Sequence, residues 1–308
     1  MTRPSPRTRS GIAIQAPGTP ADLHLHSNHS DGTERPAEVM RRAHDVGLRT
    51  VSLTDHDQIS GWEEAAIAAN SLGMTFLPGM ELSVRGAKDT LHLLAYLFDP
   101  DDAPLMDEVR RIREDRLTRA RRIVSRLTPT YGITWDDVTA GTADGVTIGR
   151  PHIADALVSA GVVSSRAQAF DDILDVRHDY YEPLYSPSVI TAVRLVVAAG
   201  GVPILAHPIT GPVDRVLSTE RVAELVEAGL AGFEVGHRDN TSEGRQILSA
   251  YARAHDLIVT GSSDYHGDGK PNRLAENTTD AAMVERIIAQ GNGATPRYPA
   301  AGPRGGAA

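Results

Sequence analysis

The sequence of 308 residues predicts an α/β fold with a mainly parallel sheet, either open or closed into a barrel, and a helical insertion. Short apolar or β-branched runs alternate with helical patterns along most of the chain, which is typical of strand–helix–strand units. Residues 101–185 break this alternation. Without those 85 residues, the body of about 270 keeps 185. This length is short of the roughly 200–250 residues of an eightfold barrel, so seven strands fit better.

Seven runs have the length and composition of strands, with turn residues at their ends. They are residues 21–26, 50–56, 75–83, 90–98, 202–207, 232–237 and 257–264. The link from Arg85 to Asp89 has the length of a hairpin loop, so we expect the third and fourth strands to be antiparallel. Helical patterns separate the other neighbours, which favours parallel pairing.

Five amphipathic segments connect these strands. Pro36 opens the first segment and Gly47 ends it, and Gly200 and Gly229 follow two of the others. Proline near the start and glycine just past the end are typical of helices. We therefore predict helices at residues 36–47, 61–72, 187–199, 219–228 and 241–255.

The region that breaks the alternation contains helical patterns and few strand candidates. A long, arginine-rich amphipathic segment at 105–127 precedes shorter ones at 151–159 and 166–174. We interpret residues 101–185 as an inserted helical domain that caps a ligand site on the rest of the fold. The main domain is then discontinuous and comprises residues 21–100 and 186–290.

The composition excludes several classes of protein. A net charge of −9 is opposite to the basic surface that grips duplex nucleic acid. The absence of cysteine excludes disulfides, thiolate metal sites and a cysteine nucleophile. No apolar run approaches the ~18 residues of a membrane span, so we expect a cytoplasmic protein without a membrane partner. Residues 1–20 and 291–308 lack periodicity and are predicted to be disordered tails, and nothing indicates the oligomeric state.

Two imidazoles project from the end of the first predicted strand. In His24-Leu25-His26 the strand period of two puts both histidines on one face. Asp31 follows beside Gly32, in a turn that can return a carboxylate to the same place. On its own, such a pair also fits two hydrogen-bonded core histidines. The other strands decide between these interpretations.

Every other predicted strand also ends in, or carries, a histidine or a carboxylate. These residues are His56, Glu81, His92, His207, His237, Asp264 and His266. Active sites of parallel α/β folds lie at the carboxyl ends of the strands. Imidazole and carboxylate ligate Mn²⁺, Fe²⁺ and Zn²⁺. Without His237, the set numbers nine with His24, His26 and Asp31, which exceeds the ~4 to 6 ligands of a single ion, so we predict two or three ions.

The ordered motifs HLHSNHSDGT, SLTDHDQISG, GMELS, LHLLAY, ILAHP, FEV and GSSDYHG resemble those of the PHP (polymerase and histidinol phosphatase) superfamily. The resemblance covers about residues 21–100 and 186–268. It implies a distorted sevenfold (β/α) barrel that holds a trinuclear metal centre. One departure is Ser262, because the family often has glycine directly before Ser-Asp. This change leaves the ligands intact but can alter the local turn.

The resemblance also implies how the ligands are grouped. One ion would lie among His24, His26, Glu81 and Asp264. Glu81 would bridge to a second ion that His92 and His207 complete, and the third ion would lie among Asp31, His56 and His266. Mn²⁺ is the expected metal, with Fe²⁺ or Zn²⁺ as alternatives.

A centre of three divalent ions and three carboxylates is strongly positive and favours a phosphate ligand. A hydroxide that bridges two of the ions would attack phosphorus, because bound metals lower the pKa of water and stabilise charge on the phosphoryl oxygens. No protein nucleophile is then needed.

Five further residues are candidates for supporting roles, each with a plainer alternative. Asp55 would orient a ligand imidazole, or serve as a turn or cap aspartate. His237 would contact substrate or transfer a proton, or be a satisfied polar residue. Arg150 and His152 would grip a second phosphate, or form a surface ion pair and a helix start. Lys270 would meet phosphate, or be solvated.

The helix expected at 105–127 carries many arginines among acidic residues, including Arg110, Arg111, Arg113, Arg116, Arg119, Arg121 and Arg122. It could steer short nucleic acid, although the mixed charges favour a solvated face.

Two features point to a subgroup of the family. The motif GRPHIA at 149–154 resembles the bacterial 3′,5′-nucleoside bisphosphate phosphatases, which are related to exoribonucleases that trim short RNA. Asp31 stands where many histidinol phosphate phosphatases have histidine. We therefore predict a phosphoesterase that acts on such a bisphosphate or on short RNA. The alternatives are a phosphatase of histidinol phosphate or another small monoester, and a non-catalytic scaffold, against which the intact ligand set argues.

Overall fold

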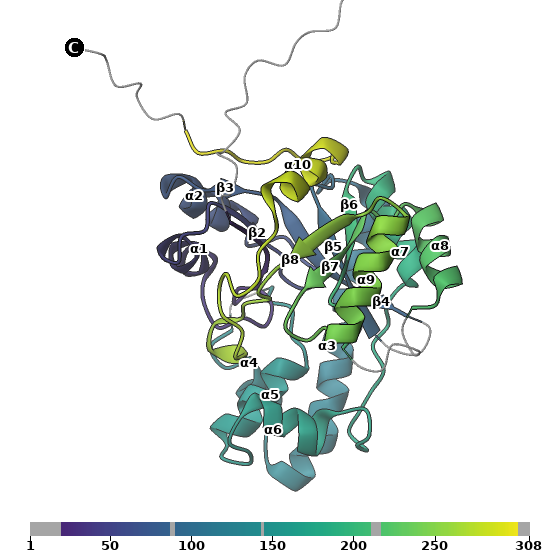
Figure 1. The fold of residues 1–308 in the computed structure, drawn as a ribbon. Coiled ribbons are helices and arrows are strands. Elements are labelled where there is room, and N and C mark those ends of the chain that lie inside the picture. The colour runs from purple at the N-terminus through teal and green to yellow at the C-terminus, as the bar shows by residue number, and fades with distance from the viewer. Residues whose placement is uncertain (1–19, 87–89, 143–144, 211–216, 301–308) are drawn as a thin grey trace, which may run out of the picture.

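A computed structural model describes residues 20–86, 90–142, 145–210 and 217–300. The chain forms an α/β body and a helical lobe that extends from one end of it (Figure 1). The predicted N-terminal tail, except Pro20, and part of the predicted hairpin loop lie outside the described residues. In the part of the chain that is described, no helix is long and apolar enough to cross a membrane.

The first sheet contains three parallel strands, β1 (Ala21–Leu25), β2 (Thr50–Leu53) and β3 (Thr75–Phe76). The helices α1 (Pro36–Asp45) and α2 (Trp62–Ser71) connect them, as predicted, and pack side by side. Their apolar faces enter the main core of the body through residues such as Val39, Met40 and Ala65.

The second sheet contains five strands in chain order, β4 (Gly79–Arg85), β5 (Thr90–Tyr96), β6 (Val202–Ala206), β7 (Gly232–Gly236) and β8 (Ile258–Gly261). β4 and β5 are antiparallel, which confirms the predicted hairpin pairing. β5 is also antiparallel to β6, whereas β6, β7 and β8 are parallel. Three predicted helices accompany these strands, α7 (Val189–Ala198), α8 (Thr219–Ala228) and α9 (Ser242–Ala254).

The prediction of one strand over residues 75–83 was wrong. The chain leaves the first sheet after Phe76 and enters the second at Gly79. Pro78 lies between them and has no N–H to donate to a strand ladder, which accounts for the break.

The two sheets meet at two isolated bridges instead of forming one continuous ladder. Leu25 pairs with Tyr265 beyond β8, and His56 beyond β2 pairs with Glu81 of β4. These bridges bring the ends of β1, β2, β4 and β8 together. The closed sevenfold barrel stays a prediction, because the described strands form two separate sheets.

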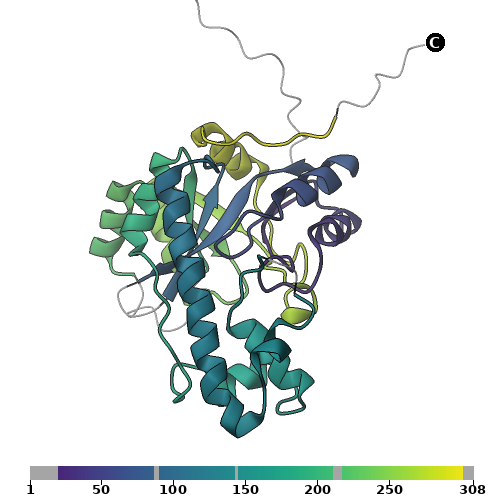
Figure 2. The same cartoon turned by 180° about the vertical axis from the view of Figure 1, so that it is seen from behind.

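The insertion has its own apolar core, formed by α3 (Ala103–Tyr131), α4 (Trp135–Thr139), α5 (Arg150–Ser159), α6 (Arg166–Ala169) and a π-helix at Phe170–Leu174. α3 is the long helix that runs from the body into the lobe in Figure 2. Leu105 and Ile112 near its start pack in the core of the body, whereas Ile123 and Leu127 pack in that of the lobe. The boundary predicted at residue 101 is therefore too early, because the first turns of α3 belong to the body.

The C-terminal prediction also needs correction. Residues 281–290 form a further helix, α10 (Ala281–Gln290), and residues 291–300 pack on the body instead of forming a solvated tail. The amide of Ala294 donates to the carbonyl of Leu97 over 2.7 Å, and Arg297 forms an antiparallel bridge with Phe76. β3 is an edge strand, so the backbone groups of Phe76 on its open side can pair with Arg297, which composition alone does not reveal.

Candidate metal centre

The nine predicted ligands converge around the bridges between the sheets. Seven of them lie at or beyond the carboxyl ends of β1, β2, β6 and β8, whereas Glu81 and His92 lie near the starts of β4 and β5. His24 lies in β1 and His26 directly follows its last residue, Leu25. All five residues of the strand are buried. Seven of the nine side chains belong to buried residues, and His92 and His207 are partly buried. The sequence prediction that these residues share one site agrees with this arrangement.

Glu81 is the centre of the cluster, and its two carboxylate oxygens contact five imidazoles. Oε1 lies 2.9 Å from Nδ1 of His92 and 3.3 Å from Nε2 of His207. Oε2 lies within 3.1–3.3 Å of ring nitrogens of His24, His26 and His56. A single carboxylate between two sets of imidazoles has the geometry of a bridging ligand.

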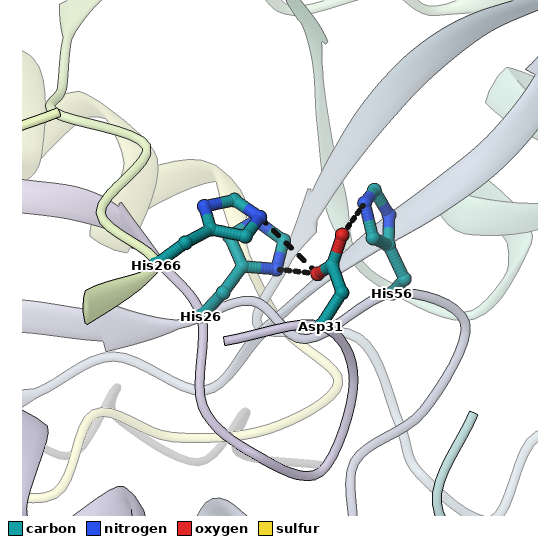
Figure 3. A group of neighbouring side chains, drawn as sticks. All are labelled: His26, Asp31, His56 and His266. Carbon is teal, nitrogen blue, oxygen red and sulfur yellow. Dashed lines mark ion pairs between the residues drawn. The ribbon is translucent and has the colours of Figure 1, made fainter. Parts of the chain in front are cut away.

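Asp31 forms a second focus, shown in Figure 3 between His266 and His56. Oδ1 lies 3.1 Å from Nε2 of His266 and 3.6 Å from Nδ1 of His26, and Oδ2 lies 3.8 Å from Nε2 of His56. The turn that returns Asp31 to the cluster depends on Gly32. A Cβ atom there would lie 2.7 Å from the carbonyl oxygen of His26, so a larger residue would displace the loop.

Asp264 completes the cluster from the segment after β8. Oδ1 lies 3.4 Å from Nε2 of His24 and 3.3 Å from Nε2 of His26. The backbone φ angles of Asp264 and His207 are 54° and 26°, in the left-handed region that residues other than glycine rarely adopt. Such strain persists where the surrounding structure enforces it, often at functional sites. The departure at Ser262 leaves Asp264 in place, and the amide of Ser262 donates to the carbonyl of Gly236.

The spacing of the donor atoms suits coordination of divalent ions better than hydrogen bonding among the side chains. Nε2 of His266 and Nδ1 of His56 are buried without a hydrogen-bond partner, although each lies 3.1 Å from a carboxylate oxygen. The Nε2 atoms of His24 and His26 are also only 3.1 Å apart. Ligand atoms about 2.1 Å from an ion lie roughly 3 Å apart at right angles. The spacing therefore matches atoms that converge on shared ions.

The electrostatics of the cluster keep its carboxylates ionised. Burial would raise the pKa of Glu81, but His92, His24 and His56 hold it well below its ordinary value. Burial would likewise raise the pKa of Asp264, yet the charge of Lys270 and the neighbouring imidazoles lower it strongly. The carboxylate is the form that binds cations.

Among the described residues, four overlapping sets of donor atoms lie close enough to share an ion. They are His24, His26, Glu81 and Asp264; His26, Asp31, His56 and His266; His56, Glu81 and His92; and His24, His207 and Glu234. A family model described as the PHP domain matches residues 22–254. The chain belongs to the PHP domain family.

Relatives of this PHP domain protein are enzymes of phosphate-ester chemistry. The 3′,5′-nucleoside bisphosphate phosphatase of Chromobacterium violaceum is 33% identical over 87% of this chain and 94% of its own. A 5′-3′ exoribonuclease of Haemophilus influenzae is 32% identical over 80% of this chain and 89% of its own. A solved structure from Bifidobacterium adolescentis, assigned as a metal-dependent phosphoesterase, is 42% identical with a TM-score of 0.86 and covers 90% of this chain and 98% of that one. The protein is a metal-dependent phosphoesterase, which confirms the predicted enzyme class.

Glu234 belongs to the site of the PHP domain although the sequence analysis did not single it out. Its Oε1 lies 3.0 Å from Nδ1 of His24, and its Oε2 accepts from the amide of His207 over 3.1 Å. It lies in the FEV motif, which was used only as part of the family pattern. Glu234 fixes the orientation of His24 and so determines which ring nitrogen faces Glu81.

We expect Glu234→Gln to lower activity and metal affinity by about 10- to 100-fold, the usual cost of losing such a supporting carboxylate. The amide keeps the shape of Glu234 but loses the charge that orients His24. Metal titration of the variant alongside steady-state kinetics measures both effects. Unchanged affinity and turnover would contradict the assigned role.

Asp55 supports the PHP site differently from the prediction. Within the described residues, its carboxylate forms no hydrogen bond or ion pair with an imidazole. Its carboxylate accepts from the amide and hydroxyl of Ser27, over 2.8 and 2.7 Å, and from the hydroxyl of Ser30 over 2.6 Å. The Ser30 hydroxyl lies 3.3 Å from Nδ1 of His26. Asp55 thus holds the loop that carries Asp31, because Ser27 and Ser30 both belong to that loop. Its link to the imidazole of His26 is indirect and passes through Ser30.

A cavity of about 330 Å³ opens beside the cluster, between the body of the PHP domain and the insertion. We call it the inner cavity. Asp31, His56 and His92 form part of one wall. Five cationic residues also line it, namely Arg116, Arg119, Arg150, Arg166 and Lys270. The prediction that the arginines of α3 form a solvated face was therefore wrong for Arg116 and Arg119, which face this cavity.

Two of the four arginines are neutralised and two are not. Arg116 lies 2.9 Å from Asp57, and Arg166 pairs with Asp155. Within the described residues, Arg119 and Arg150 form no ion pair.

The two unpaired arginines instead contact carbonyls and aromatic rings. Arg119 donates to the carbonyl of Glu182, and Arg150 donates to that of Leu174 and packs over Phe170 and Tyr181. Burial and the neighbouring charges of Arg150 and Arg116 lower the pKa of Arg119 to about 9. An anion in the cavity would relieve this repulsion.

The structure separates Arg150 from His152. Nδ1 of His152 accepts from the amide of Gly149 over 3.2 Å, so this side chain turns back to the start of α5 and does not line the inner cavity. This contact favours its alternative as a helix-start residue, and its predicted contact with a phosphate stays a prediction.

His237 and Lys270 lie next to Asp264. His237 is fully buried, with Nε2 3.6 Å from Oδ2 of Asp264 and no hydrogen-bond partner for that nitrogen. Lys270 donates to the same oxygen over 2.8 Å and lines the inner cavity, so it is not simply a solvated lysine. Contact of either residue with substrate stays a prediction.

Proposed function

We propose that this phosphoesterase removes the 3′-phosphate of nucleoside 3′,5′-bisphosphates and also trims short RNA. The observation that carries the proposal is the joint lining of one cavity by candidate metal ligands and by unpaired arginines. A substrate with two phosphate groups can place one against the ligand cluster and the other against the arginines.

We assign three divalent ions to the cluster, with Mn²⁺ as the first choice and Fe²⁺ or Zn²⁺ as alternatives. The ligands of the three sites are His24, His26, Glu81 and Asp264; Glu81, His92 and His207; and Asp31, His56 and His266. Such ions supply Lewis-acid stabilisation of phosphoryl oxygens and lower the pKa of bound water. Imidazole and carboxylate donors suit all three metals.

Residues of the chain bind the substrate and position the side chains of the site. Arg150 and Arg119 bind the phosphate that does not react, because planar guanidinium groups suit phosphate oxygens. Asp57 holds Arg116 in the cavity, and Glu234 holds His24. Remote binding of this kind raises the rate when it positions the scissile phosphate.

The relatives support the same substrate class. The full-length similarity to a 3′,5′-nucleoside bisphosphate phosphatase and to a 5′-3′ exoribonuclease favours nucleotides over histidinol phosphate. The intact ligand cluster also argues against a scaffold without activity, since a structural metal site needs only about four ligands.

Turnover of a substrate panel by metal-replete enzyme tests this proposal. The panel contains adenosine 3′,5′-bisphosphate, adenosine 5′- and 3′-monophosphates, a short oligoribonucleotide and histidinol phosphate. We expect the highest kcat/KM for the bisphosphate or the oligonucleotide, with release of the 3′-phosphate from the bisphosphate. A preference for histidinol phosphate or the monophosphates would refute the proposed substrate class.

A further inference from the structure

Helix α3 presents arginines to two different cavities. Arg116 and Arg119 line the inner cavity, whereas Arg110, Arg113 and Arg121 line a second cavity of about 670 Å³ in the lobe. We call the second one the outer cavity. Residues 110, 113 and 121 recur at multiples of the helical turn and so share one face of α3, while residues 116 and 119 lie on another.

The outer cavity combines positive charge with a partly buried aromatic side chain. Trp135 of α4 contributes to its wall, and the guanidinium carbon of Arg121 lies 5.0 Å from the centre of a Trp135 ring. Among the described residues that line the cavity, three are arginines and one, Glu114, is acidic. This local excess of positive charge stands out in a chain whose net charge is −9.

A short segment connects the two cavities. Gly145 and Thr147 line the outer cavity, and Arg150 and Pro151 line the inner one. The amide of Thr147 donates to the carbonyl of His29 over 3.1 Å, which anchors the segment to the loop that carries Asp31. One continuous stretch of chain, residues 145–151, therefore contributes to the walls of both cavities.

We propose that the outer cavity binds the downstream nucleotides of a single-stranded oligoribonucleotide whose end lies at the metal centre. Trp135 stacks on a base, and Arg110 and Arg121 contact the phosphates that follow. Proteins that bind single strands commonly combine aromatic platforms with cationic grooves in this way. The inference rests on the proposed function, because it assumes that the inner cavity accepts the terminal nucleotide.

The inner cavity alone cannot perform this role for longer substrates. Its volume of about 330 Å³ is at the lower end of small-ligand pockets, so further nucleotides must lie outside it. Arg113 is less available than its neighbours because it donates to the carbonyl of Gly145. Arg110 and Arg121 are both exposed. Arg110 pairs with the exposed Asp107 over 2.8 Å, a weak surface ion pair that a phosphate can replace, and Arg121 packs over Trp135.

Steady-state kinetics on two substrates test the outer cavity. The variant Arg110→Gln/Arg121→Gln removes two charges that do not line the inner cavity. The matched control, Arg111→Gln/Arg122→Gln, removes two charges from the same helix outside the outer cavity. For a pentaribonucleotide we expect the first variant to lose about tenfold in kcat/KM, with adenosine 3′,5′-bisphosphate unaffected and the control near wild type on both.

Fluorescence of the metal-loaded enzyme provides a second measurement. The chain has two tryptophans, so Trp62→Phe leaves Trp135 as the reporter. A pentaribonucleotide with phosphorothioate linkages should quench its emission, and adenosine 3′,5′-bisphosphate should not. The Arg110→Gln/Arg121→Gln changes in this background should weaken the quenching.

The outcomes separate this inference from the proposed function. If wild-type enzyme fails to turn over both the bisphosphate and the pentaribonucleotide, the proposed function is wrong. If it turns over both, but the outer-cavity variant loses neither or loses both equally, the outer cavity does not bind RNA. Equal losses in the control variant would also overturn the inference, because they would indicate a general effect of charge.

Discussion

Glu81→Gln abolishes phosphate release, with an expected loss of at least about 10³-fold in kcat, because bound ions contribute several kcal/mol of transition-state stabilisation. Glutamine keeps the shape of the side chain but not its charge. The carboxylate of Glu81 lies within 3.3 Å of five imidazoles, so no other group in the cluster can replace it. Kinetics and metal content of the purified variant measure the effect.

Glu234→Gln is the matched comparison for this prediction, since both changes remove one buried carboxylate from the same region. Glu234 orients His24 and supports His207 but has no place in the assigned ion sites. Its effect should therefore be at least tenfold smaller than that of Glu81→Gln. If Glu81→Gln retained near-wild-type turnover with a normal fold, the cluster would not be the active site.

Arg150→Ala is the second change with a large expected effect, and it concerns selectivity. For adenosine 3′,5′-bisphosphate we expect kcat/KM to fall by about 10- to 150-fold, because a hydrogen bond between charged groups contributes roughly 1.5–3 kcal/mol. For adenosine 3′-monophosphate the loss should be much smaller, since that substrate has no second phosphate for the arginine. Arg150→Lys should recover only part of the activity, because lysine lacks the planar fork.

Arg126→Ala serves as the control for Arg150→Ala. Arg126 also belongs to the lobe, but it pairs with Glu182 and does not line the inner cavity. Thermal unfolding of both variants corrects for lost packing, since Arg150 lies over Phe170 and Tyr181. Equal proportional losses on both substrates would mean that Arg150 contacts the reacting phosphate. No loss on either would remove it from the binding site.

Short-range patterns in the sequence were sufficient to predict most of the ligand cluster. The period of two in His24-Leu25-His26 is a local property of a strand, and the ends of parallel strands necessarily share one edge. Glu234 was missed for the opposite reason. Its role depends on reaching Nδ1 of His24 from another strand, 210 residues away in sequence, and a single glutamate in a strand does not reveal that contact.

The division of the arginines on α3 also depends on tertiary structure. Mixed acidic and basic residues predict a solvated helix, and Arg110 and Arg121 are exposed as such a pattern suggests. Arg119 is only 5% exposed because the lobe folds back over that face of the helix. The rotation of a helix about its axis relative to the lobe is set by packing, so the sequence could not assign Arg116 and Arg119 to the inner cavity.

The fold predictions succeeded where local periodicity was sufficient and failed where contacts between distant segments decide the structure. Alternating strands and helices were recognised from local periodicity, including the hairpin of β4 and β5. The break at Pro78, the entry of α3 into the main core and the packing of residues 291–300 were not. Each of these features depends on which distant segment a stretch of chain meets, and composition does not encode that partner.

Elemental analysis of the purified, metal-reconstituted protein tests the central claim most directly. The geometry of the nine donors around Glu81 and Asp31 predicts two to three equivalents of Mn, Fe or Zn per chain, because nine nitrogen and oxygen donors exceed the ~4 to 6 ligands of one ion. At most one ion per chain after reconstitution, in enzyme that still releases phosphate, would contradict the multinuclear centre.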